Sequence, residues 1–140
     1  MYLLDTNVIS ELRRPHPHGA VLAWLGSVAD SDLYLSAVSL GEIQAGIELT
    51  RAQNAAKASE IELWADQVAA CYNVLAMDAN TFRLWARLLH GRSDTLYEDA
   101  MIAATAKQHH LTVVTRNVAD FAHFAKCGVA VFNPFTFSAG

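Results

Sequence analysis

The sequence predicts an α/β fold in which a parallel sheet of four to five strands is covered by helices on both faces. Two observations lead to this prediction. Short apolar runs alternate with segments of helical periodicity, which is the order in which crossover helices join parallel strands. The runs also end in polar residues that stop a strand and start a helix. The predicted strands span residues 2–4, 33–35, 73–77, 111–115 and 129–132.

The composition indicates one domain over residues 1–140, with 53% hydrophobic and 17% charged residues. Cys71 and Cys127 lie far apart without metal-ligand spacing, so we expect reduced core thiols of a cytoplasmic protein. Asp5 interrupts the first apolar run, and no uncharged stretch is long enough to span a membrane, so we expect neither a secretory signal nor a membrane helix. The net charge of -4 argues against non-specific coating of nucleic acid.

The first predicted strand, 2–4, is followed directly by Asp5, Thr6 and Asn7. Ligands of open α/β sheets bind outside the carboxyl ends of the strands, so a carboxylate and a hydroxyl at this point are well placed for chemistry. The alternative is structural, because Asp5 or Thr6 is also a good N-cap for a helix over 8–13.

The next candidate is Glu42, near the start of a predicted helix that follows the strand 33–35. Ser39 and Glu42 have the spacing of a capping box, so Glu42 is either a site residue or a cap of its own helix. Gly41 and Gly46 are unfavourable inside a helix. They predict a close approach of another backbone at this helix.

Three further helices follow from periodicity. A long amphipathic helix is expected over 52–72, and Asp78 is expected to cap the next one. Residues 96–110 predict a buried helix that is apolar all round, with Asp99 in its first turn. The positive end of the helix favours an anion there, so Asp99 is either a dipole or capping residue or a ligand.

The last strand end repeats the pattern of the first. Asn117 and Asp120 follow the strand 111–115, so carboxyl ends of strands and starts of helices gather Asp5, Glu42, Asp99 and this corner at one sheet edge. Oxygen ligands without Cys or paired His suit a hard cation such as Mg²⁺ or Mn²⁺.

Four segments repeat, in order and at similar spacing, the motifs of a known family. They are residues 3–8 (LLDTNV), 39–42 (SLGE), 98–106 (EDAMIAATA) and 114–121 (VTRNVADF). The chain thereby resembles PIN-domain proteins, and most closely the VapC-type toxins of bacterial type II toxin–antitoxin pairs, in the FitB-like branch. The resemblance covers essentially the whole chain.

The resemblance implies a PIN-like three-layer α/β/α fold and a metal-dependent RNA endonuclease. Asp5, Glu42 and Asp99 match the three acidic catalytic and metal-ligand positions, and Thr6 matches a supporting hydroxyl. The fourth acidic position of many members is Asn117 here, which supplies no charge. Asp120 either compensates for it or caps the short helix that follows.

The implied reaction is attack of a metal-activated water on an RNA phosphodiester, with Mg²⁺ or Mn²⁺ as the cation and no covalent nucleophile. Arg116, Arg13 and Arg14 are the candidates for substrate-phosphate contacts. The family also implies a VapB/FitA-type antitoxin, a homodimer and a larger assembly with the antitoxin. Transfer RNA is one candidate target among several, and DNA cleavage is not excluded.

Three alternatives compete with this interpretation. An aspartyl-phosphate phosphatase would need Asp where Asn7 stands, and a suitably placed Lys. A catalytically weak PIN module that binds antitoxin or RNA is supported by Asn117 alone. In the third alternative each carboxylate is only a helix cap.

Overall fold

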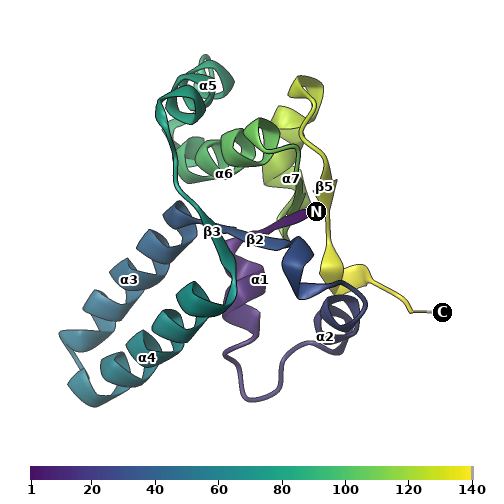
Figure 1. Cartoon of the computed structure of the whole chain (residues 1–140). Helices are drawn as coiled ribbons and strands as arrows, with labels where there is room; N and C mark the ends of the chain where they lie inside the picture. The colour runs from purple at the N-terminus through teal and green to yellow at the C-terminus, as the bar shows by residue number, and fades with distance from the viewer. Residues whose placement is uncertain (140) are drawn as a thin grey trace.

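The computed structural model describes residues 1–139 and contains a five-stranded sheet in the order β3-β2-β1-β4-β5 (Figure 1). Every neighbouring pair of strands is parallel, as predicted. The strands are β1 (Tyr2–Leu4), β2 (Leu33–Ser36), β3 (Asn73–Leu75), β4 (Thr112–Val114) and β5 (Val131–Phe132).

Helices cover both faces of the sheet, so the predicted three-layer α/β/α fold is confirmed (Figure 1). One face carries α1 (Thr6–Glu11), α2 (Gly19–Gly26), α3 (Ala37–Arg51) and α4 (Ala55–Cys71). The other carries α5 (Ala79–Leu89), α6 (Tyr97–Gln108) and α7 (Val118–Phe121). Successive residues of a strand point to opposite faces, so Leu4 packs in the first layer of helices and Leu3 in the second, both fully buried.

β1 is the central strand, and the chain leaves it and β4 toward opposite faces of the sheet. α1 follows β1 on one face and α7 follows β4 on the other. The Asp5 N–H donates to the Val114 carbonyl at 2.9 Å, which holds the two strand ends side by side. This is the topological switch point, where open α/β sheets bind their ligands.

The alternative in which Ser39 and Glu42 form a capping box at the start of α3 is ruled out. β2 runs directly into α3, and the N-cap is Ser36, whose hydroxyl accepts from the Val38 N–H at 3.1 Å. Ser39 therefore lies inside the helix, fully buried, and its hydroxyl has no hydrogen-bond partner within residues 1–139. Glu42 lies in the second turn, too far along the helix to cap it.

The structure corrects three further expectations. Apart from the neighbouring residues and the backbone of α3 itself, no atom within residues 1–139 lies within 4 Å of a Cβ built on Gly41 or Gly46, so no other element approaches them closely. The long helix predicted over 52–72 begins only at Ala55, because Asn54 caps it and separates it from α3. Both cysteines are free, as expected, but Cys71 is exposed rather than in the core.

Asp78 is the N-cap of α5, as predicted, and accepts from the Thr81 N–H at 2.8 Å. Among residues 1–139, no helix combines the length and the apolar character that crossing a membrane requires.

Candidate functional site

Asp5 ends β1 and caps α1, so the structural role considered from the sequence is present. Its carboxylate does more than cap. One oxygen accepts from the Thr6 N–H at 2.8 Å, and the other accepts from the Thr115 hydroxyl at 2.8 Å and from the Asn7 side-chain amide at 3.1 Å. Burial raises the pKa of Asp5 above its ordinary value, and these three donors partly offset that rise. The side chain is only 6% exposed, so its position is tightly defined.

Glu42 reaches the same corner from α3. Its carboxyl accepts from the Thr6 hydroxyl at 3.1 Å, so Thr6 contacts Glu42 by its side chain and Asp5 by its backbone. Burial, a hydrogen bond with Glu98 and the Glu98 charge raise the pKa of Glu42 to about 7. The Glu42 and Glu98 carboxyls therefore lie close together, and a proton or a cation between them would relieve their repulsion.

Asp99 lies in the first turn of α6, and its carboxylate makes no hydrogen bond within the described part of the chain. It is not a cap, because the N-cap of α6 is Leu96. The pKa of Asp99 is raised to about 6. Burial is the largest cause, and the negative charges of Asp5, Asp120 and Glu98 add to it. These shifts mean that the acidic side chains of three helices lie close enough to repel one another.

Two residues, Asn117 and Asp120, lie where many family members have the fourth acidic residue of the site. Asn117 is the exposed N-cap position of α7, but its side chain makes no capping hydrogen bond, and only its N–H contacts the site, donating to the Thr115 hydroxyl at 3.0 Å. Asp120 is not the cap of α7, which rules out that alternative. Its charge adds to burial in raising the pKa of Asp5 and Asp99. The negative charge at this corner therefore comes from Asp120.

Two residues of the site, Glu98 and Thr115, were not singled out from the sequence. Glu98 directly precedes Asp99, and only the tertiary structure brings it to Glu42. Thr115 is fully buried at the end of β4 and binds Asp5, while Asn7 contacts both and accepts from the Arg116 N–H at 3.1 Å. The only local signal for Thr115 was its place at the end of a buried strand, and the only one for Glu98 was its place beside Asp99.

The three candidate arginines differ in their surroundings. Arg13 lines a hollow of about 280 Å³ together with Thr6 and Glu42, so it faces the acidic site. Arg14 forms an ion pair with Glu11 at 3.2 Å and does not line this hollow. The Arg116 guanidinium lies 4.6 Å from the centre of the Phe135 ring. Arg13 is therefore the best placed of the three to meet a ligand.

The donor set of the site consists of oxygen atoms from carboxylates and a hydroxyl, which suits a hard divalent cation. Within residues 1–139, no three His, Cys, Asp or Glu side chains are arranged as ligands of one metal ion. The Glu42 carboxyl is instead engaged with Glu98 and Thr6. A cation bound by Glu42 would therefore compete with these two contacts.

The fold and this site define an α/β protein with a carboxylate cluster at the switch point of a parallel sheet. Residues 2–126 match the PIN domain family model, and the chain belongs to the PIN-domain family. Relatives along almost the whole chain are toxin FitB of Neisseria gonorrhoeae and a VapC ribonuclease of Sinorhizobium fredii. FitB is 41% identical (96% of this chain, 99% of FitB), and the VapC ribonuclease is 34% identical (96% and 98%).

Solved structures agree with this assignment. A crystal structure of FitAcB from Neisseria gonorrhoeae matches with a TM-score of 0.84 at 38% identity, covering 98% of this chain and 100% of that chain. A structure of FitAB bound to a DNA fragment matches with a TM-score of 0.83 at 37% identity, covering 99% and 98%. The predicted family and fold are therefore confirmed.

Proposed function

We propose that this protein is a divalent-metal-dependent RNA endonuclease, a toxin of VapC type that a cognate antitoxin inhibits. The observation that carries the proposal is the approach of Glu42 and of Asp99 to Asp5 at the switch point, where burial and neighbouring charges raise the pKa values of Glu42 and Asp99, and burial raises that of Asp5. Within residues 1–139 none of these three carboxylates forms an ion pair, so a cation between them would relieve their repulsion. The ribonuclease and toxin names of the relatives support the same activity.

Asp5, Glu42 and Asp99 are the residues that would hold Mg²⁺ or Mn²⁺, with Asp120 adding negative charge beside them. When bound, such a cation lowers the pKa of a water molecule and neutralises charge on the phosphate. The protein contributes orientation. The Thr115, Thr6 and Asn7 donors hold Asp5 in one position, and the Thr6 hydroxyl also holds Glu42.

Arg13, on the wall of the hollow beside Glu42, is the cation available to a substrate phosphate. Cleavage by an activated water needs no Ser, Cys or His nucleophile. Arg14 is engaged with Glu11, so we assign it no substrate contact.

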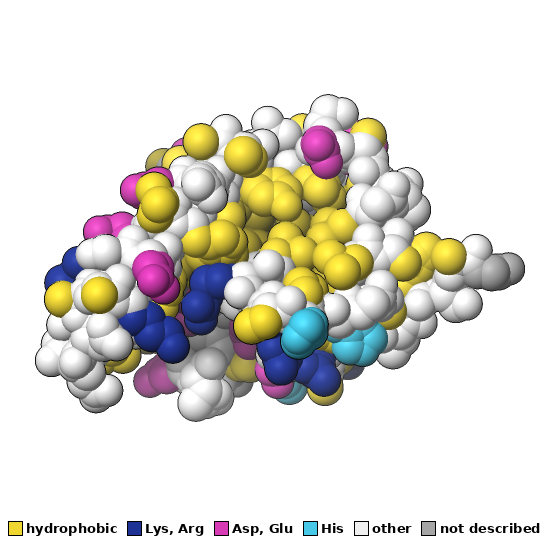
Figure 2. All heavy atoms as spheres, turned by 90° about the horizontal axis from the view of Figure 1, so that it is seen from below, with side chains coloured by type: hydrophobic (Ala, Val, Ile, Leu, Met, Phe, Trp, Pro, Cys, Tyr) yellow, Lys and Arg dark blue, Asp and Glu magenta, His cyan; other side chains and the backbone are white. Residues whose placement is uncertain are grey.

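The negative charge of the site also indicates how an antitoxin would inhibit the protein. FitB and VapC proteins occur in solved complexes with their antitoxins, and a basic residue of an antitoxin segment would neutralise this acidic cluster. Figure 2 shows apolar side chains gathered around a depression on the face seen from below. A hollow of about 270 Å³, lined by Trp64, Val68 and Tyr72 among others, offers apolar surface to a partner. We expect a homodimer in the cytoplasm that forms a larger assembly with the antitoxin.

The test is cleavage of a mixed tRNA pool by purified, antitoxin-free protein with Mg²⁺ or Mn²⁺, against EDTA. The Asp5→Asn and Asp99→Asn variants should lose cleavage, whereas Asp66→Asn, at an exposed position of α4, should keep it. If well-folded protein cuts nothing with either metal, the proposed nuclease is wrong. Asn117 would then mark a lost function, and a PIN module that only binds antitoxin or RNA would replace it.

A further inference from the structure

Positive charge gathers at one end of this acidic protein. Residues 79–140 contain six of the ten Lys and Arg residues but only four of the fourteen Asp and Glu residues. Three of those four acids, Glu98, Asp99 and Asp120, belong to the acidic site. Apart from Asp94 and Asp78, the N-cap of α5, the remaining charged side chains of the α5, α6 and α7 layer are basic, in contrast to the net charge of -4.

A basic hollow of about 470 Å³ lies between α5 and the carboxyl end of α6. Arg83 and Arg87 of α5 line it together with Lys107 and His110, and no acidic side chain does. Within residues 1–139, none of these groups forms an ion pair, whereas Arg14 and Arg51 do. The two guanidinium groups are thus available to an anion.

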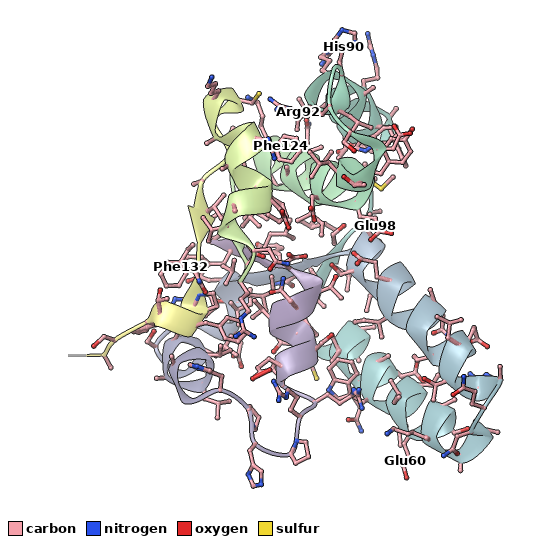
Figure 3. All side chains as sticks on the ribbon, turned by 180° about the vertical axis from the view of Figure 1, so that it is seen from behind. Glu60, His90, Arg92, Glu98, Phe124 and Phe132 are labelled. Atoms are coloured by element: carbon pink, nitrogen blue, oxygen red, sulfur yellow. The ribbon has the colours of Figure 1, made fainter. Side chains whose placement is uncertain are left out.

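The positive surface continues around the end of α6. Lys107 and His110 also line a second hollow of about 430 Å³, and the Lys107 ammonium donates to the Cys127 carbonyl. Arg92 and Lys126 line a third hollow of about 250 Å³ with His123. In Figure 3, Arg92 lies beside Phe124 at the same end of the molecule as His90, far from Glu60. We call this surface the basic arc; its members are Arg83, Arg87, Arg92, Lys107, His110, His123 and Lys126.

We propose that the basic arc binds phosphate groups of an RNA strand outside the phosphodiester that is cut. This inference rests on the proposed function for the identity of the strand, and on charge and geometry for the site. Lys107 lies eight residues from Asp99 on α6, or about 12 Å along the helix axis. A phosphate in the basic hollow is therefore not the one at the acidic site. Arginine guanidinium groups suit phosphate because their donors form a planar fork.

The test separates binding from cleavage. A labelled single-stranded RNA of about 20 nucleotides is titrated in EDTA with the wild-type chain, an Arg83→Gln/Arg87→Gln variant and an Arg51→Gln/Lys57→Gln control, at salt between about 50 and 200 mM. The control removes the same charge from α3 and α4. Loss of two phosphate contacts should reduce the slope of log K against log salt by about 1.4, whereas the control keeps it. Circular dichroism and thermal melting establish that both variants are folded.

A second readout is cleavage with Mg²⁺ or Mn²⁺. The α5 variant should cut the long RNA less efficiently, through a higher KM, and cut a trinucleotide as well as wild type. Reduced RNA binding without any cleavage by the wild type supports the basic arc and contradicts the nuclease. An unchanged slope in the α5 variant, or no RNA binding at all, overturns the basic arc. Tighter binding of DNA of the same length, with the same loss of slope, assigns the surface to DNA instead.

Discussion

Removal of divalent cations should make the stability of this protein depend on pH through Glu42 and Asp99. Burial is the main cause that raises the pKa of Glu42 from 4.5 to about 7 and that of Asp99 from 3.8 to about 6. Such carboxyls favour the folded state when protonated. Their contribution is fully present below the unfolded pKa and is lost as pH rises through the folded pKa. The free energy of unfolding of metal-free protein should therefore fall between about pH 4 and pH 7.

The magnitude follows from the two pKa values. Each corresponds to roughly 3 kcal/mol before solvent screening, at 1.36 kcal/mol for each pKa unit. Both carboxyls are only half-buried and they share charged neighbours, so we expect a combined effect of about 2 kcal/mol. For a chain of this size, that is a decrease in Tm of roughly 6–8 °C.

The assay is thermal or urea unfolding in EDTA across this pH range, for wild type, Glu42→Gln and the control Glu60→Gln on the exposed side of α4. Glu42→Gln should remove about half of the pH dependence, and Glu60→Gln none of it. The pKa values of Glu11, Glu48, Glu62 and Asp78 are lowered, so these groups contribute the opposite slope, and only below their ordinary pKa values. A Tm that is constant or rises toward pH 7 in EDTA would refute the reasoning. Added Mg²⁺ or Mn²⁺ should raise the Tm more at high pH, because the ligands must be deprotonated.

Four further predictions concern single side chains. Ser36→Ala should lower the free energy of unfolding in urea by about 1 kcal/mol, because it removes the N-cap of α3. Ser39→Ala should cost nothing, because its buried hydroxyl has no partner, and equal losses would contradict this assignment. Thr115→Val should cost about 1.5–3 kcal/mol and raise the pKa of Asp5, moving the acid limb of the cleavage profile to higher pH. Thr115→Ser should restore both. Asp120→Asn should lower the pKa of Asp99 and move that limb to lower pH; an unchanged profile would show that the Asp120 charge does not act on the site.

Local sequence was sufficient where a signal lies within one element. The alternation of apolar runs with helical periodicity predicted all five strands, and the N-cap preference of Asp predicted the start of α5 at Asp78. Asp5 and Asp99 were also recognisable, because each carboxylate directly follows or begins a buried element. Their positions depend only on the ends of β1 and α6.

Local sequence misled where two short-range signals compete. The Ser39 and Glu42 spacing matches a capping box, but β2 passes into α3 at Ser36 without a loop. Pairing of β2 with β1 and β3 determines where the strand ends, and hence where the helix begins. The glycines misled in the same way. Gly41 and Gly46 suggested a close approach of another backbone, but no other element within residues 1–139 comes close to them.

The sequence by itself determined the elements of this protein and the chemical type of its site, because both arise from neighbouring residues. Only the tertiary structure decided which side chains meet. The Thr115 hydroxyl reaches Asp5 across 110 residues because β4 pairs with β1, and Glu98 reaches Glu42 because α6 and α3 cover opposite faces beside the same sheet edge. Such contacts depend on strand order, which is set by burial summed over the whole chain and leaves no signature in any one segment.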